Sequence, residues 1–244
     1  PGTVVTAKHF PCRVEWLPDL HELAHSLGME FGATLFDIET SESEMVRTYL
    51  DYVKCSSYDL LRHDLIRALA ATGKPLILST GMATLSEVKE VVNNEFATSY
   101  KVIEWRARIH DLPVRYIRAD ADAARLTLLH CVSLYPCPVE KANLARIERL
   151  RRDMSMKVGY SDHTADWTTI CRAVNHWKAE VVEVHLDLDD GEGVETKHSL
   201  CPSTAQSIIS ELRMDGDGSD CPSAEEQAER KWRADPSDSM RPMQ

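Results

Sequence analysis

The sequence predicts an α/β protein in which helices cover a parallel β-sheet. Short apolar runs of strand length alternate along the chain with amphipathic stretches of helix length. The runs are apolar almost throughout, which is typical of parallel strands that are buried on both faces. Six such units are visible in the 244 residues. A closed eight-stranded barrel requires two more units, whereas an open doubly wound sheet requires none.

The elements follow in order along the chain. The predicted strands are the runs 29–36, 52–57, 75–80, 125–133, 156–161 and 181–186. Helices are predicted over 18–28, 59–74, 84–92, 143–152, 166–177 and 203–213, where apolar residues recur at helical spacing. Gly28 and Gly73 are C-terminal stop signals for two of these helices. Thr84, with Glu87 three residues later, predicts a capping box.

Two regions depart from this alternation. Residues 97–124 separate the third and fourth runs too widely and carry several arginines, so we predict an insertion there, although 113–119 (PVRYIRA) also reads as an extra strand. Residues 213–244 are rich in Asp, Gly, Ser and Pro and predict a linker, a short helix around 223–232 and an extended tail. The main predicted domain is therefore 1–212.

The composition excludes several classes of protein. Hydrophobic residues make up 43% of the chain, as in an ordinary globular protein. The formal net charge is −11, and this negative charge argues against nucleic acid or an anionic membrane as the main partner. No apolar run approaches the ~20 residues that cross a bilayer. The first ten residues lack the pattern of a signal peptide. The seven cysteines include no CxxC pair and are odd in number, so we expect reduced thiols and a cytoplasmic protein.

Almost every predicted strand ends in polar side chains. These are His, Lys, Ser and Thr, whereas ordinary turns favour Gly, Pro, Asn and Asp. In parallel α/β folds ligands bind at the carboxyl ends of the strands, so we expect these side chains to share one site. The candidates are Thr34, Lys54, Ser57, Asp59, Ser79, His130, Ser133, Tyr135, Ser161, His163, Glu183 and His185.

Two histidines and one lysine carry the chemical interpretation, and each has a plainer alternative. His163 and His185 follow or end successive strands, where they can bind one divalent metal with open positions for substrate. The plainer alternatives are an ordinary loop histidine for His163 and a core histidine for His185, and each explains its residue about as well as a metal site does. Lys54 lies inside an apolar run, and a lysine there requires an anion unless its strand is at a sheet edge.

Hydroxyl groups extend this interpretation. Ser57, Ser79 and Ser161 are each weak signals alone, because serine ends many strands. Together with Lys54 they predict a cradle for a phosphate group. Asp59 is either the cap of the following helix or a catalytic carboxylate.

Three stretches resemble one known family: KPLILSTGMATLSEVKEVV (74–92), LLHCVSLYPCPVEKANL (128–144) and VGYSDHT (158–164). They are similar to the sialic acid synthases, the phosphoenolpyruvate-dependent N-acetylneuraminate synthase family, which includes legionaminate and pseudaminate synthases. The resemblance covers about 16–212. It implies a (β/α)8 TIM-type barrel that the chain enters after the first two strands, so that about six β/α units are visible.

The resemblance implies a function and roles for residues. Phosphoenolpyruvate would condense with an N-acetylated aminosugar aldehyde, such as N-acetylmannosamine, to a nonulosonic acid of polysaccharide biosynthesis, with release of phosphate. His163 and His185 would bind a divalent metal, Mn²⁺ or Mg²⁺. Lys54 would contact phosphoenolpyruvate and act in catalysis. Further substrate contacts would be Thr34, Ser57, Ser79, Ser133, Tyr135 and Ser161. Asp59 and Glu195 would be catalytic or reach the metal site.

The sequence also departs from the family pattern. The glutamate of the family's first strand and the lysine of its second have no counterpart, and Asp59 stands where glutamate is usual. Two alternatives therefore stay open: a catalytically impaired phosphoenolpyruvate- or sugar-binding homologue or fragment, and a barrel aldolase that forms a Schiff base on Lys54. Because two missing strands would expose sheet edges, we also expect such a chain to be unstable or to need a partner, as in a homodimer.

Overall fold

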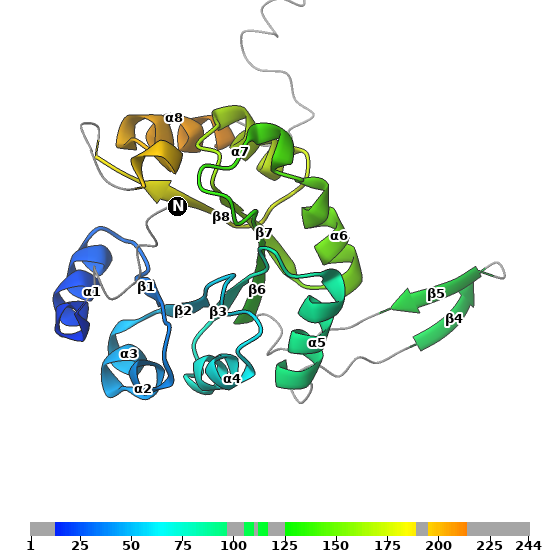
Figure 1. Cartoon of the computed structure of the whole chain (residues 1–244), viewed down its shortest axis with the longest axis horizontal. Helices are drawn as coiled ribbons and strands as arrows, with labels where there is room; N and C mark the ends of the chain where they lie inside the picture. The colour runs from blue at the N-terminus through cyan, green and yellow to red at the C-terminus, as the bar shows by residue number, and fades with distance from the viewer. Residues whose placement is uncertain (1–12, 97–104, 110–111, 117–124, 189–194, 214–244) are drawn as a thin grey trace, which may run out of the picture.

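The computed structural model describes residues 13–96, 105–109, 112–116, 125–188 and 195–213. A seven-stranded sheet in the order β1-β2-β3-β6-β7-β8-β9 forms its centre, and every neighbouring pair in it is parallel. The sheet curves into an open half-barrel with helices along its outer side (Figure 1). The predicted α/β class with a parallel sheet is confirmed. The described strands do not by themselves establish the eight units of a closed barrel.

Six strands coincide with the six predicted runs. They are β1 (Gly32–Thr34), β2 (Tyr52–Cys55), β3 (Leu76–Ser79), β6 (Leu126–His130), β7 (Lys157–Asp162) and β8 (Val182–Leu186). The seventh strand, β9 (Ser199–Leu200), is too short to carry a periodic pattern, and the sequence does not predict it.

Six helices also lie where the sequence predicts them. They are α1 (Leu17–Ser26), α4 (His63–Ala71), α5 (Leu85–Phe96), α6 (Ala145–Met154), α7 (Trp167–Asn175) and α8 (Pro202–Leu212). Two unpredicted short helices, α2 (Ile38–Glu42) and α3 (Glu44–Tyr49), connect β1 to β2. Three short 3₁₀ helices also lie among the described residues: η1 (Val14–Trp16), η3 (Val139–Lys141) and η4 (Thr196–His198).

The predicted helix boundaries have the expected local causes. Gly28 and Gly73 follow α1 and α4 with φ angles of 71° and 72°, a left-handed conformation that glycine adopts at little cost. At the start of α5, the Glu87 amide donates to Thr84 Oγ1 (3.3 Å) while the Thr84 amide donates to Glu87 Oε2 (2.6 Å). The predicted capping box is therefore confirmed.

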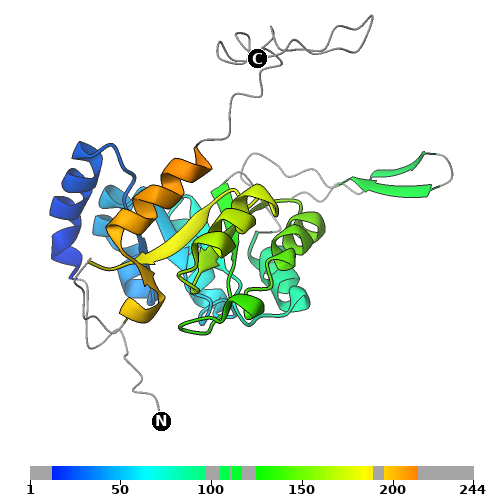
Figure 2. The ribbon, with the colours of Figure 1, turned by 90° about the horizontal axis from the view of Figure 1, so that it is seen from above.

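The region predicted as an insertion contains a separate hairpin. Strands β4 (Trp105–Ile109) and β5 (Leu112–Tyr116) pair antiparallel with each other and do not join the main sheet (Figures 1 and 2). The predicted extra strand at 113–119 overlaps β5, while β3 pairs directly with β6. The rest of 97–124 and the predicted linker, helix and tail from 214 onward lie outside the described residues, so these assignments stay predictions.

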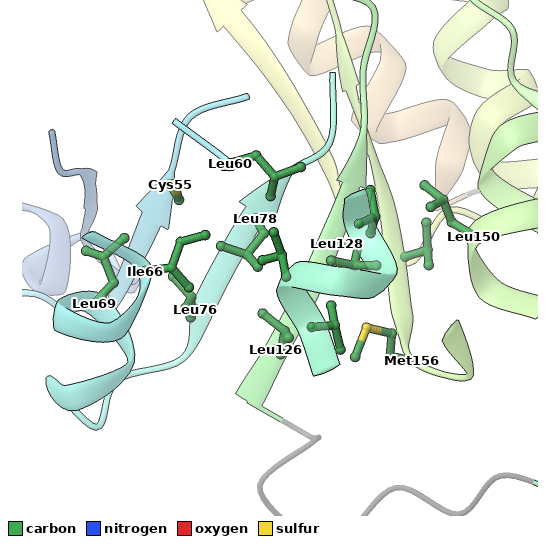
Figure 3. Packing of buried hydrophobic residues seen from close by; sticks show 14 of the residues in the cluster. Cys55, Leu60, Ile66, Leu69, Leu76, Leu78, Leu126, Leu128, Leu150 and Met156 are labelled. Atoms are coloured by element: carbon green, nitrogen blue, oxygen red, sulfur yellow. The ribbon is translucent and has the colours of Figure 1, made fainter. Parts of the chain in front are cut away.

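Alternation along the strands divides the sheet into two faces. Val53 and Cys55 of β2, Leu78 of β3, Leu128 of β6 and Val158 of β7 belong to one buried cluster, together with leucines and isoleucines of the surrounding helices. Figure 3 shows several of these side chains packed between sheet and helices. The intervening residues of each strand point to the opposite, concave face. That face carries most of the candidate site.

Candidate active site

An ion pair joins β2 to β8 on the concave face of the sheet. Lys54 Nζ lies 3.2 Å from Glu183 Oε2, and the two side chains are 16% and 30% exposed. The hydroxyl of Ser161 donates to Glu183 Oε1 over 2.7 Å. Ser161 and Glu183 are register partners on β7 and β8, as Thr34 and Lys54 are on β1 and β2. The sequence predicts that Lys54 requires an anion, and within the chain Glu183 supplies it.

His163 follows β7 directly and has a fixed tautomer. Its Nδ1 lies 2.7 Å from the carbonyl oxygen of Val132, which can only accept, so Nδ1 carries the proton. The other nitrogen, Nε2, lies 3.3 Å from Ser161 Oγ and keeps a lone pair. Burial lowers the pKa of His163, the bond to Val132 opposes this, and neighbouring His185 lowers it further. The neutral imidazole that results is the form that binds metals.

Three rings gather beside this histidine. Tyr135 lies over His163 with ring centroids 4.2 Å apart, and His185 is 5.4 Å from His163 on the same measure. His198 completes the group at 4.7 Å from His185 and 5.2 Å from Tyr135. Tyr135, His163 and His185 thus come together as the sequence predicts. His198 was not predicted.

Donor atoms in this group suit a metal ion. His185, Glu195 and His198 each place one donor within 4.8 Å of the others, and His185 Nδ1 is 2.9 Å from Glu195 Oε2. The Nε2 atom of His198 is buried and has no hydrogen-bond partner among the described residues. Burial and nearby His185 both lower the pKa of His198. Neutral imidazoles with a carboxylate fit a divalent transition metal such as manganese or zinc.

A hydroxyl cluster lies at the ends of β2, β3 and β6. The Oγ atoms of Ser57 and Ser133 are 3.2 Å apart. A Cβ added to Gly81 would lie 2.4 Å from Ser57 Cβ and 2.7 Å from Ser133 Oγ, and Gly81 has a φ of +43°. The hydroxyls therefore approach each other only because residue 81 has no side chain. Ser79 Oγ is buried without a hydrogen-bond partner among the described residues.

The hydroxyl cluster and the lysine act on the same buried thiol. Burial raises the pKa of Cys131, while a bond from the Gly81 backbone, the charge of Lys54 and a bond from Ser57 each lower it. Ser57 therefore contacts Cys131, and the charge of Lys54 acts on the same thiol.

Asp59 is held by contacts in the loop after β2. It accepts from Ser56 Oγ at 2.6 Å and lies 3.3 Å from an Arg62 nitrogen, while Arg62 also donates to the carbonyl of Phe36. The helix-cap alternative for Asp59 is wrong, because Arg62 is the N-cap residue of α4 and no side chain caps that helix. Asp59 instead ties the loop after β2 to the loop after β1.

Two further polar residues of the strand ends are structural. His130 is buried and its Nε2 donates to the carbonyl of Ala142 over 2.8 Å, so it belongs to the core. Burial lowers its pKa to about 4. Asp162 accepts from Tyr160 Oη (2.9 Å) and from the Ala165 amide (2.8 Å), and thereby shapes the loop that carries His163.

The model of the NeuB family matches residues 3–216 of this chain. The chain belongs to the NeuB family. The resemblance to sialic acid synthases is thereby confirmed. The N,N'-diacetyllegionaminic acid synthase of Legionella pneumophila is 29% identical over 80% of the chain and 49% of that protein. An uncharacterized protein of Methanocaldococcus jannaschii is 31% identical over 80% of the chain and 51% of that protein.

A solved structure supports the NeuB assignment. The N-acetylneuraminic acid (sialic acid) synthetase of Leptospira borgpetersenii superposes with a TM-score of 0.69 at 27% identity, over 89% of this chain and 69% of that chain. The NeuB chain spans about half the length of the curated relatives that it matches. Among its described residues, no helix has the length and apolar character needed to span a bilayer.

Two residues of the candidate site were not predicted from the sequence. Gly81 lies inside a quoted motif, but the close approach that requires a glycine there becomes visible only when Ser57 and Ser133 are placed beside it. His198 lies in the 3₁₀ helix η4. Neither strand nor helix periodicity marks it.

Proposed function

We propose that the chain is the barrel domain of a nonulosonic acid synthase, which condenses phosphoenolpyruvate with an N-acetylated aminosugar aldehyde and releases phosphate. In the complete protein the half-barrel would belong to a closed (β/α)8 barrel. The observation that carries the proposal is the convergence of Lys54 and Ser161 with His163 and His185 at one end of the sheet, in a member of the NeuB family. The names of the relatives support the reaction class.

The chemistry follows from the groups at hand. C3 of phosphoenolpyruvate would attack the aldehyde carbon, the aldehyde oxygen would take a proton, water would add at C2, and phosphate would leave with cleavage of its carbon–oxygen bond. Lys54 would neutralise the anionic substrate after exchanging its partner Glu183. Tyr135 would cover the pocket beside the histidines. Hydroxyl donors to phosphate or carboxylate would be Thr34, Ser57, Ser79, Ser133 and Ser161. Candidates for proton transfer are Asp59 and Glu195.

Two sets of residues could hold the metal. In the first, His163 and His185 both use Nε2, because the Nδ1 atoms are engaged by Val132 and Glu195; Glu195 then orients His185 as an outer carboxylate. In the second, His185, Glu195 and His198 bind directly. When bound, a divalent ion such as Mn²⁺ or Mg²⁺ would polarise the sugar aldehyde as a Lewis acid.

Metal affinity distinguishes the two sets. If the first set holds the metal, titration with Mn²⁺ should show at least a ~10-fold loss of affinity in His163→Gln. If the second set holds it, His198→Gln should show that loss instead. His176→Gln is the matched control, because His176 is exposed and its ring contact is with Trp177. If both site variants bind Mn²⁺ as tightly as the control, neither set holds the metal.

Turnover and binding together test the proposed function. Phosphate release from phosphoenolpyruvate plus N-acetylmannosamine with Mn²⁺ is expected, and Lys54→Met should lower both phosphoenolpyruvate affinity and turnover by at least ~10-fold. Binding of phosphoenolpyruvate without turnover would instead identify an impaired homologue. A folded chain that binds no phosphoenolpyruvate would refute both.

The Schiff-base aldolase predicts a different outcome. Borohydride would then trap a substrate adduct on Lys54. The ion pair with Glu183 favours anion binding instead, because a Schiff base requires an uncharged amine.

The expected homodimer stays a prediction, which light scattering of the purified chain would test.

A further inference from the structure

A second group of metal-ligand side chains lies at the opposite end of the sheet from the candidate active site. His21 and His25 lie four residues apart on one face of α1, and Asp51 directly precedes β2. One donor atom from each lies within 4.8 Å of the other two. Because Asp51 stands at the amino end of a parallel strand, this cluster is separate from the carboxyl ends that carry His163 and His185.

Contacts within the cluster are preorganised. His25 Nε2 lies 2.8 Å from Asp51 Oδ2, and the His21 and His25 rings are 3.8 Å apart. The amide of Phe31 donates to Asp51 Oδ2 at 2.7 Å and fixes the carboxylate in place. This bond first, and the bond from His25 second, lower the pKa of Asp51. The carboxylate is therefore charged and held beside two imidazoles.

One nitrogen in the cluster is unused. His21 Nδ1 is buried and has no hydrogen-bond partner among the described residues. Leaving a buried polar atom unpaired is unfavourable, and coordination of an ion by this nitrogen would remove the penalty. The edge of the Tyr49 ring faces His21 at 5.8 Å between centroids and limits the positions that the imidazole can take.

We propose that His21, His25 and Asp51 form a structural transition-metal site, with Zn²⁺ as the fitting ion, that pins α1 to the start of β2. Two imidazoles and a carboxylate suit Zn²⁺, and three protein ligands leave a fourth position for water. Ligand distances of about 2.1 Å in a tetrahedral site hold donor atoms about 3.4 Å apart. The ion would replace the proton between His25 and Asp51. The site is independent of the proposed function.

The test separates this cluster from the histidines of the candidate active site. A variant carrying H185Q and H198Q removes donors at the carboxyl end, and Zn²⁺ titration of it against a competing chelator should still show one equivalent. Adding H21Q should weaken that equivalent by at least ~10-fold, while adding H176Q should not. H21Q keeps the His25–Asp51 pair. Titration with Co²⁺ gives a spectroscopic readout, because the intensity of its visible absorption bands distinguishes a tetrahedral site from the hydrated ion.

The outcomes are decisive in both directions. Absence of a bound equivalent in H185Q/H198Q overturns the proposal, as does equal affinity with and without His21. If H21Q prevents folding, D51N provides the second variant, because its amide oxygen still accepts from the Phe31 amide but is a poor ligand. Retention of Zn²⁺ by D51N with unchanged affinity would likewise overturn it. A Zn²⁺-dependent rise in unfolding temperature that H21Q abolishes supports the structural role.

Discussion

Replacement of Gly81 by alanine tests the geometry of the hydroxyl cluster. The added methyl group would lie 2.4 Å from Ser57 Cβ and 2.7 Å from Ser133 Oγ. Real Cβ atoms do not approach carbon so closely, so Ser57 or the backbone at residue 81 must move. We expect both a loss of stability and a weaker anion site, because the two hydroxyls are displaced together.

Two terms contribute to the loss of stability. A non-glycine residue at positive φ costs roughly 1–2 kcal/mol, partly offset by about 0.4–1 kcal/mol from the reduced freedom of the unfolded chain. Overpacking a tight site adds about 1–3 kcal/mol. Gly28 isolates the first term, since its φ is +71° and an added Cβ would meet nothing within 4 Å. Gly81→Ala should therefore destabilise the chain by about 1–3 kcal/mol more than Gly28→Ala.

Urea denaturation of both variants measures this difference directly. The midpoint should fall further for Gly81→Ala at an unchanged slope. Combining it with Ser57→Gly, which removes the nearest clashing atoms, should recover part of the loss in a double-mutant cycle. Phosphoenolpyruvate affinity should drop for Gly81→Ala and stay near normal for Gly28→Ala. Equal free energies of unfolding for the two glycine variants, within about 0.5 kcal/mol, would refute the close approach.

Three other results are expected. The unfolded state protonates His130 near pH 6.5 and the folded state only near pH 4, so the free energy of unfolding should fall by roughly 3 kcal/mol as the pH drops through this window. Chemical denaturation at pH 7 and at pH 4 should show a smaller fall for His130→Gln than for the unchanged chain. An identical fall in both would exclude this cause. Thr84→Ala should cost about 1 kcal/mol in thermal unfolding, whereas Thr84→Ser should not. Tyr160→Phe removes a buried bond to Asp162 and should cost about 1–3 kcal/mol; a smaller change would show that this bond does not fix the loop.

The strands and long helices could be predicted because burial imposes a regular pattern on them. The two short helices after β1 could not, since five and six residues are less than two full turns. Their caps are local: the Asp37 side chain accepts from the Thr40 amide, and Ser43 accepts from the Val46 amide. Such polar residues read equally well as a loop.

The candidate site was predictable in position but not in pairing. Strand ends indicated which side chains would meet, and Lys54, Ser161, His163 and His185 do lie together. The partner of Lys54 depends on which strands curve toward each other across the half-barrel. A single sequence contains no local signal for that curvature.

Strand register links the core to the site. Along β2, Val53 and Cys55 are fully buried among apolar side chains, while the residue between them, Lys54, reaches Glu183 on the concave face. A slip of one residue would exchange the two faces and place an ammonium group among leucines. An unpaired charge there costs several kcal/mol, and Glu183 would lose its partner as well.

The same constraint acts on β7. Val158 and Tyr160 lie in the core, whereas Ser161 is in register with Glu183 and donates to it. Polar residues of the site therefore favour the same register as the apolar residues of the core. Side chains of the candidate site thus contribute to specifying the fold. Because both faces of β2 and β7 disfavour a slip, the side chains that these strands place on the concave face keep their positions relative to each other, which favours a preorganised site.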